Sequence, residues 1–248
     1  MSRGIYITAN DKATEQAIAL LNSIRLYDPE TPVILIPYDD NYHHVAKILG
    51  EQYNVQLYPD LKRVETLAQT IFDIFGDNLF ARPNQFRKQV CWFGEFDQFL
   101  YIDTDIVVFE KIADNLDYLN NYDFLCCDYQ HSKGIKNVFS PKVIEDQVFS
   151  DAELKEIYNG GFWASKKNLL SEECASHLEY FDFSEKTSDQ PIINYLILKR
   201  VPRRYNILRD NVKGAGNWAG SPHFQRQGDI LFDPKVNQPL KYLHWAGI

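Results

Sequence analysis

The sequence predicts an α/β fold with a parallel, doubly wound sheet. Short apolar runs alternate with segments whose apolar residues have helical spacing through the first hundred residues, and this β-α-β-α-β order is typical of such sheets. A second observation is the apolar run Phe99–Phe109, which Asp103 and Asp105 interrupt. Ligands of doubly wound sheets bind outside the carboxyl ends of the strands. We therefore expect a site where this run leaves the sheet.

Each element of the first half has a local signal in the sequence. Continuous apolar runs predict buried strands, and apolar residues three and four apart predict helices. Asn10 or Asp11 can cap the first helix, and Asp28 with Pro29 ends it. In chain order, the expected elements are strand 4–8, a helix opening at Asn10 or Asp11, strand 33–36, helix 41–49, strand 55–58, helix 61–75, helix 86–98 and strand 99–102.

The second half is less regular. Apolar runs at 124–127 and 162–165 predict two further strands. Asp189 and Gln190 open a helix with Pro191 in its first turn, a position that suits proline. After residue 202 the chain is rich in glycine, asparagine and proline. No repeat or clear linker divides the chain, so residues 1–248 are expected to form one domain.

Composition excludes several classes of protein. The 248 residues include 26 basic and 34 acidic side chains, a net charge of −8, which argues against binding to nucleic acids or anionic membranes. No apolar stretch approaches the roughly 20 residues that cross a bilayer, and no secretory signal is visible, so a cytoplasmic protein is expected. Aromatic residues make up 14% of the chain and either pack the core or line a pocket for bases or sugars. Buried free thiols are expected at Cys91, Cys126, Cys127 and Cys174.

The segment Asp103-Thr104-Asp105 suggests a metal–phosphate site. Ionised carboxylates are costly to bury unless something pairs with them. Hard divalent cations prefer oxygen ligands, and Mg²⁺ is often held by one or two carboxylates together with substrate phosphates. Residues i and i+2 of a straight strand are about 7 Å apart, so the strand end must bend for both carboxylates to bind one ion. The alternative is a strand-end turn with solvated carboxylates.

Taken in order, the motifs resemble those of GT-A fold glycosyltransferases, particularly the family-8-like group that includes glycogenin and bacterial galactosyltransferases. Each motif alone is weakly specific, but their order matches that group over almost the whole chain. The Asp-x-Asp segment lies within Tyr101–Val108. The other motifs are Ile5–Asp11, Phe86–Lys88, Cys127–Asp128, Asn159–Phe162, Ser188–Gln190, Tyr205–Asn206 and Leu243–Gly247.

This resemblance implies a Rossmann-like, nucleotide-diphospho-sugar transferase fold: one GT-A domain with a mixed central sheet. Residues 1–108 would form the nucleotide-binding half and residues 109–248 the half that binds sugar and acceptor. The implied activity is metal-dependent transfer of a hexose from a nucleoside-diphosphate sugar, with UDP as the commonest nucleotide and with retention of anomeric configuration. The acceptor is left open, and a homodimer is the base-rate expectation.

The resemblance also implies which residues bind the donor and the metal. The loop after the first strand would hold base and ribose, and basic residues before the Asp-x-Asp segment would contact the diphosphate. The His244 imidazole would shift the metal preference from Mg²⁺ toward Mn²⁺. The expected donor-binding residues are Thr8, Ala9, Asn10, Asp11, Arg87, Lys88, Asp103, Thr104, Asp105, Asn159, Gly160 and Gly161, and the expected metal ligands are Asp103, Asp105 and His244.

Three residues are expected to act near the reacting sugar. The Asp189-Gln190 pair would lie near the anomeric carbon and the sugar hydroxyls, and Asp128 would orient the sugar or the acceptor. No strong base is needed if the leaving phosphate takes the acceptor proton. Purely structural roles are the alternative for several of the expected site residues. Asp189 can cap its helix, Asn10 can cap another, and Asn159-Gly160 can form a plain turn.

Other hypotheses stay open at this stage. The resembling group usually continues past its glycine to a Lys-Pro-Trp segment, whereas this sequence stops at Ile248, which supports a catalytically silent nucleotide-sugar-binding protein. A haloacid-dehalogenase-like phosphohydrolase also carries Asp-x-Asp after an apolar strand, and a nucleotide-sugar pyrophosphorylase has a related fold. The adjacent His43 and His44 favour a solvated helix face, and Gly214–Gly220 is a candidate lid.

Overall fold

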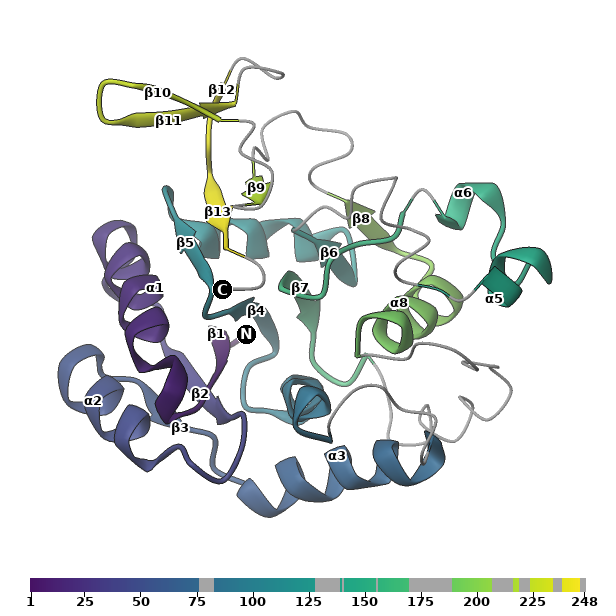
Figure 1. The fold of residues 1–248 in the computed structure, drawn as a ribbon, viewed down its shortest axis with the longest axis horizontal. Helices are drawn as coiled ribbons and strands as arrows, with labels where there is room; N and C mark the ends of the chain where they lie inside the picture. Colours follow the sequence, from purple (N-terminus) through teal and green to yellow (C-terminus); the bar gives the residue numbers. More distant parts are fainter. Residues whose placement is uncertain are drawn as a thin grey trace.

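The computed structural model describes residues 1–75, 83–127, 139, 141–154, 156–169, 189–206, 216–218, 224–233 and 238–245. A seven-stranded mixed sheet forms its centre, in the order β3-β2-β1-β4-β7-β6-β8 (Figure 1). Strand β7 is antiparallel to β4 and β6, and the other neighbouring pairs are parallel. The strands are β1 (Arg3–Ala9), β2 (Val33–Pro37), β3 (Gln56–Leu57), β4 (Gln98–Asp103), β6 (Phe124–Cys126), β7 (Phe162–Lys166) and β8 (Arg204–Asn206).

Helices cover both faces of this sheet (Figure 1). Buried residues of α1, α2 and η4 pack on one face, and those of α3, η3 and α8 pack on the other. The short α5 and α6 follow β6 in the chain. The helices are η1 (Asp11–Ala13), α1 (Thr14–Tyr27), α2 (His43–Tyr53), α3 (Leu61–Phe75), η3 (Pro83–Phe93), η4 (Ile112–Asn120), α5 (Pro141–Glu145), α6 (Asp151–Leu154) and α8 (Asp189–Arg200), the η elements being 3₁₀ helices.

Alternation along the central strands explains why two cores form. In β4, Leu100 and Ile102 belong to the core beneath α1, while Phe99 and Tyr101 belong to the core beneath η3 and α8. Successive residues of a strand point to opposite faces, so a continuous apolar run is what a strand covered on both sides requires. Asp103 follows Tyr101 by two residues and therefore continues on the α8 face of the sheet.

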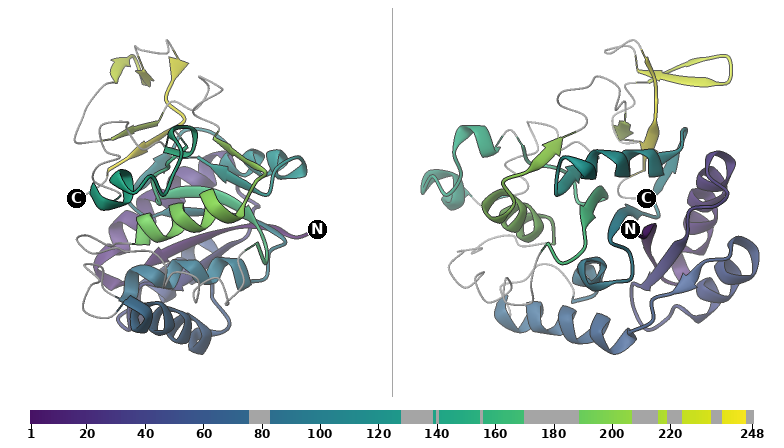
Figure 2. Two further views of the ribbon diagram at one scale, coloured as in Figure 1. Left: turned by 90° about the vertical axis from the view of Figure 1, so that its right-hand side faces the viewer. Right: turned by 180° about the vertical axis from the view of Figure 1, so that it is seen from behind.

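Two small sheets complete the described part of the chain. Strand β13 (Tyr242–His244) is antiparallel to β5 (Ile106–Val108) and parallel to β9 (Gly216–Trp218). The register places His244 opposite Ile106, so the end of the chain returns to the Asp-x-Asp segment. The second sheet extends away from the main body in all three ribbon views (Figures 1 and 2). It consists of β10 (Gln225–Gln227), β11 (Ile230–Asp233) and β12 (Gln238–Pro239).

The mixed α/β architecture predicted from the sequence is confirmed, with shifted boundaries. The helix predicted to run to residue 98 ends at Phe93. At the next residue, Gly94, the backbone passes so close to Tyr6 that a Cβ there would lie 1.9 Å from the Tyr6 hydroxyl oxygen. Strand β3 is only two residues long. Several sequence expectations lie outside the described residues, namely those on Asp128, Cys174, Ser188, Gly247 and most of Gly214–Gly220.

Two further expectations concern buried thiols and membrane spans. Cys91, Cys126 and Cys127 are buried free thiols, as predicted. No helix in the described ranges combines the length and the apolar character that crossing a bilayer requires.

Candidate donor-binding site

The topology creates a crevice between β1 and β4. From β1 the chain passes to β2 and β3 on one side, and then returns to β4 on the other. The loops that leave β1 and β4 therefore diverge, which is the position where open α/β sheets bind ligands. Thr8 and Asp103 are register partners at this end of the two strands.

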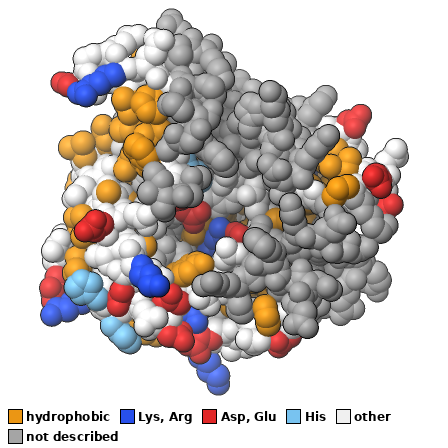
Figure 3. All heavy atoms as spheres, viewed as in Figure 1, with side chains coloured by type: hydrophobic (Ala, Val, Ile, Leu, Met, Phe, Trp, Pro, Cys, Tyr) orange, Lys and Arg blue, Asp and Glu red, His pale blue; other side chains and the backbone are white. Residues whose placement is uncertain are grey.

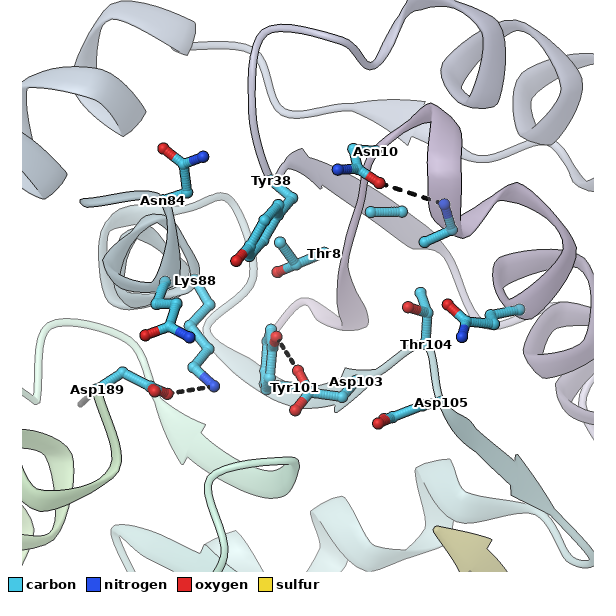
Figure 4. A pocket seen from close by; sticks show the side chains of 14 residues that line it. Thr8, Asn10, Tyr38, Asn84, Lys88, Tyr101, Asp103, Thr104, Asp105 and Asp189 are labelled. Atoms are coloured by element: carbon cyan, nitrogen blue, oxygen red, sulfur yellow. Dashed lines mark hydrogen bonds and ion pairs between the residues drawn. The ribbon is translucent and has the colours of Figure 1, made fainter. Parts of the chain in front are cut away.

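A cavity of about 550 Å³ occupies this crevice. Side chains from β1, α1, η3, β4 and α8 line it (Figure 4). In the space-filling view, acidic and basic side chains lie next to one another in a recess near the middle of the face (Figure 3). The lining residues are Thr8, Ala9, Asn10, Ala13, Gln16, Tyr38, Asn84, Gln85, Lys88, Tyr101, Asp103, Thr104, Asp105 and Asp189.

The Asp-x-Asp segment bends as the chain leaves the central sheet. Strand β4 ends at Asp103, a turn covers Thr104 and Asp105, and the chain then enters β5 of a different sheet. The carbonyl oxygen of Asp105 accepts a 2.7 Å hydrogen bond from the backbone N–H of Trp245, which ties the turn to the end of β13. The two carboxylates are therefore not held at the separation of a straight strand, and both line the cavity.

Asp103 is anchored from the sheet beneath it. The hydroxyl of Tyr101 donates a hydrogen bond to Oδ1 of Asp103, as expected for residues i and i+2 on one face. The backbone N–H of Asp103 donates to the carbonyl oxygen of Gly161 at 2.7 Å. Burial raises the pKa of Asp103, the positive charge of Lys88 opposes this shift, and the Asp105 carboxylate raises the pKa further.

Lys88 is the cation among the described residues that line the cavity. Its Nζ atom lies 2.5 Å from Oδ2 of Asp189 and 3.4 Å from the carbonyl oxygen of Gly160. Burial by itself lowers the pKa of Lys88, but the Asp103 and Asp189 carboxylates outweigh it, so the pKa is raised. The amine therefore stays charged at neutral pH, and Figure 4 shows it between Asp189 and Tyr101.

His244 approaches Asp105 from β13. Its Nε2 atom lies 3.3 Å from Oδ1 of Asp105, a buried oxygen without a hydrogen-bond partner among the described residues. Gly161 lets the segment before β7 lie close to both His244 and Asp103. A Cβ at this position would be 2.8 Å from Cε1 of His244 and 3.1 Å from Oδ2 of Asp103. Within the described residues, no three His, Cys, Asp or Glu side chains already form a metal-binding cluster.

The two basic candidates have different surroundings. Lys88 lines the cavity, whereas the guanidinium of Arg87 pairs with Asp40 at 2.9 Å and donates to the carbonyl oxygen of Pro37 at 3.5 Å. The structure therefore brings Lys88 into the cavity, and Arg87 braces the segment that follows β2.

The loop after β1 divides its side chains between local structure and the cavity. Asn10 caps η1, since its Oδ1 accepts from the N–H of Ala13, and its Nδ2 donates to Asp39 at 2.7 Å. Asp11 accepts from the N–H of Val45 at 2.9 Å, which fixes α2 against this loop. Asn10 lines the cavity, and Asp11 is not among the lining residues.

The segment before β7 is fixed by α8. Asn159 Oδ1 accepts from the N–H of Gly161 at 3.0 Å. The backbone of Tyr158 is held by Asn194, whose side chain both accepts and donates, and by Nε2 of Gln190 at 3.2 Å. Gln190 thus positions the glycine segment from the first turn of α8, while Asp189 faces the cavity.

Sequence reasoning missed six residues that line the cavity: Ala13, Gln16, Tyr38, Asn84, Gln85 and Tyr101. Tyr38 directly follows an apolar strand of the parallel sheet, and Asn84 and Gln85 immediately precede the basic motif. Position at a strand end was therefore an available signal for Tyr38.

No family model matches the chain, and no curated protein matches its sequence. Solved structures do match its fold. The galactosyltransferase LgtC, in complex with donor and acceptor sugar analogues, has a TM-score of 0.65 at 16% identity, over 98% of this chain and 87% of that one. Mouse xyloside xylosyltransferase 1 has a TM-score of 0.65 at 12% identity, over 100% of this chain and 98% of that one.

The bifunctional glycosyltransferase WbbM has a TM-score of 0.66 at 14% identity. This chain is covered completely and spans 46% of WbbM. The chain therefore has the GT-A glycosyltransferase fold. At these identities the likeness concerns the fold, and the chemistry has to be argued from the site.

Proposed function

We propose that the protein is a metal-dependent glycosyltransferase that transfers a hexose from a nucleoside-diphosphate sugar, with UDP as the nucleotide, to an acceptor hydroxyl. The observation that carries this proposal is the convergence of Asp103, Asp105, Lys88 and Asp189 on one cavity at the switch point of a GT-A fold. The structural neighbours also support it, since WbbM, LgtC and xyloside xylosyltransferase 1 are all named as glycosyltransferases.

The charge balance of the cavity favours a bound cation. Among the described residues that line it, there are three carboxylates, on Asp103, Asp105 and Asp189, and one ammonium group, on Lys88, so these carboxylates outnumber the ammonium group by two. Unpaired buried carboxylates are costly. Asp103, Asp105 and His244 would hold Mn²⁺ or Mg²⁺. The 3.3 Å approach of His244 Nε2 to Oδ1 of Asp105, and the absence of a Cβ at Gly161 beside His244 and Asp103, fit this assignment. Such an ion supplies Lewis-acid stabilisation of the leaving diphosphate.

The chain's own residues supply binding and orientation. Lys88 offers a point charge to the diphosphate, and its amine remains positive because the neighbouring carboxylates raise its pKa. Asp189 would then accept hydrogen bonds from sugar hydroxyls at the α8 end of the cavity. Gln190, held against the Tyr158 carbonyl oxygen, would keep the glycine segment close to the anomeric carbon.

Retention of configuration and the family-8-like specificity are inferred from the motifs. Except for Asp189, all described lining residues belong to residues 1–108, which supports a nucleotide-binding half followed by a sugar and acceptor half at 109–248. Asp128, a cytoplasmic location and a homodimer stay predictions. The phosphohydrolase alternative is not favoured, because the fold matches belong to glycosyltransferases.

The test is calorimetric binding of UDP with and without Mn²⁺, followed by a screen of UDP-sugars for hydrolysis, which needs no acceptor. Asp105→Asn should abolish the manganese-dependent part of UDP binding, because it removes a charged oxygen ligand without changing size. Asp114→Asn is the matched control, since that carboxylate is 73% exposed and lies outside the cavity.

Three results would redirect the proposal. Failure to bind any nucleoside diphosphate with any divalent metal would reject it. Manganese-dependent binding without turnover of any nucleotide sugar would favour the silent binding protein. A trapped aspartyl-phosphate on Asp103 would favour a phosphohydrolase.

A further inference from the structure

The cavity has a charged side and an uncharged side. Lys88 and the three carboxylates come from η3, the end of β4 with the turn that follows it, and the start of α8. The lining residues of β1, η1, α1, the end of β2 and the start of η3 carry no charge. Figure 4 shows this division, with Asn84, Tyr38 and Asn10 on one side of the cavity and Asp189, Asp103 and Asp105 on the other.

We propose that Tyr38 forms the stacking surface for the nucleobase of the donor, an inference that rests on the proposed function. A nucleoside diphosphate has its charge at one end and a flat, uncharged ring at the other. With the diphosphate at Lys88 and the Asp-x-Asp segment, the base falls into the uncharged side. Aromatic side chains stack on bases whatever the base, because every base has a π-face.

Of the aromatic residues among the described lining, Tyr38 is the one placed for this role. The other, Tyr101, is 1% exposed and donates its hydroxyl to Asp103. The ring of Tyr101 also lies beneath Lys88, with Nζ 5.3 Å from the ring centroid, so it belongs to the charged side. Tyr38 is half-buried and borders the uncharged side.

The segment that carries Tyr38 is held on two sides. The N–H of Tyr38 donates to the carbonyl oxygen of Ala9 at 2.9 Å, which continues the pairing of β1 and β2 by one residue. Arg87 contacts the residues around it, through the carbonyl oxygen of Pro37 at 3.5 Å and Asp40 at 2.9 Å. A side chain on a braced segment loses less conformational freedom when a ligand stacks on it. This also gives a role to Arg87, which is not among the described lining residues.

An oxygen without a hydrogen-bond partner lies on the same side. Gln85 lines the cavity, and its buried Oε1 has no hydrogen-bond partner among the described residues. A buried polar atom without a partner is unfavourable. An N–H group on the edge of a nucleobase would satisfy this acceptor after a small rotation of the side chain, whereas an apolar ligand would leave it unpaired.

The experiment separates the base from the diphosphate. Calorimetry in the presence of Mn²⁺ compares inorganic pyrophosphate with whichever of UDP, GDP, ADP and CDP the wild type binds most tightly. Tyr38→Ala should weaken nucleotide binding by about 5- to 100-fold, the range of one base–aromatic stack, and leave pyrophosphate binding unchanged. Tyr38→Phe keeps the ring and should bind like wild type. Tyr27→Ala is the matched control, because Tyr27 is 41% exposed and does not line the cavity.

The possible failures are distinguishable. Equal nucleotide affinity in wild type and Tyr38→Ala would overturn the stacking role and leave the proposed function standing. Equal weakening of nucleotide and pyrophosphate would also overturn it, because the substitution would then act on the whole cavity. If the wild type bound pyrophosphate as tightly as every nucleotide, the base would contribute nothing to affinity, and the inference would be rejected. A wild type that binds neither would reject the proposed function together with it.

Discussion

The Nζ atom of Lys88 lies 2.5 Å from Oδ2 of Asp189, and the ion pair joins η3 to the first residue of α8. The two side chains are 11% and 13% exposed, so solvent screens them little. Asp103 and Asp105 also act on Lys88, because both raise its pKa. One ammonium group is therefore shared among the three carboxylates of the described lining.

Lys88→Met should destabilise the metal-free protein more than Asp189→Asn does. The first substitution leaves three carboxylates without their cation and should cost about 3–5 kcal/mol, the usual result of breaking a buried pair. The second leaves Lys88 with Asp103 and Asp105 as partners, so we expect about 1–2 kcal/mol. Urea denaturation at pH 7 with a chelator measures both values.

Lys111→Met is the control for this comparison, since Lys111 is 49% exposed and its ion pair with Asp114 is long, at 4.0 Å. It should change the free energy of unfolding by less than about 0.5 kcal/mol. If Asp189→Asn proved the more damaging of the two cavity variants, the assignment of Lys88 as the shared counter-ion would be wrong.

Gly161→Ala should disrupt the manganese-dependent binding of UDP, and Gly160→Ala should not. A Cβ at Gly161 would lie 2.8 Å from His244 and 3.1 Å from Asp103, so the expected metal ligands would have to move. A Cβ at Gly160 meets Asp189 and Lys88 at 3.6 Å, an ordinary contact distance. We expect a loss of more than about tenfold in affinity for the first variant, since a displacement of about 1 Å is enough to damage such a site.

The two glycine variants control for each other, because both add one methyl group in adjacent positions. Titrations with Mn²⁺ and UDP should be compared with thermal unfolding without ligand. Similar UDP affinities in the two variants would refute the idea that close packing at Gly161 arranges the metal ligands.

Asp123, which joins the ends of β6, β7 and β8, should make the free energy of unfolding depend on pH. Its carboxylate pairs with Arg203 at 2.6 Å and with Lys166 at 2.7 Å, and the hydrogen bonds from Arg203, followed by those from Lys166, lower its pKa against the opposing effect of burial. A carboxyl whose folded pKa is lowered stabilises the fold above its unfolded pKa, here 3.8. That contribution is lost as the pH falls through the lower, folded value.

Asp123→Asn should therefore be less stable than wild type by about 1 kcal/mol at pH 7, a modest value because Arg203 is 61% exposed. The difference should shrink as the pH falls below 3.8. Urea denaturation from pH 7 to pH 3 measures it, with Asp117→Asn as the control, since the Asp117 carboxylate is 69% exposed. A difference that stays constant across this range would contradict the assignment.

The order of elements and the central motif were readable from the sequence because they depend on local patterns. Continuous apolar runs predicted the strands that became β1, β2 and β4, since strands covered on both faces need apolar residues throughout. The position of Asp103 at a strand end followed from the interruption of such a run. The sequence also predicted a helix cap at Asn10 or Asp11, and the Asn10 side chain does accept from the N–H of Ala13.

Only the tertiary structure decided which side chains meet. Lys88 and Asp189 are 101 positions apart in the sequence, and their contact exists because η3 and α8 pack on the same face of the sheet. The choice between Arg87 and Lys88 depends on which neighbour points toward the cavity, a rotation that spacing alone does not specify. Tyr38 joins the cavity because β2 lies beside β1. Local sequence determines an element and its ends, whereas a site is a set of distances between elements, and those distances are set by the packing of the whole chain.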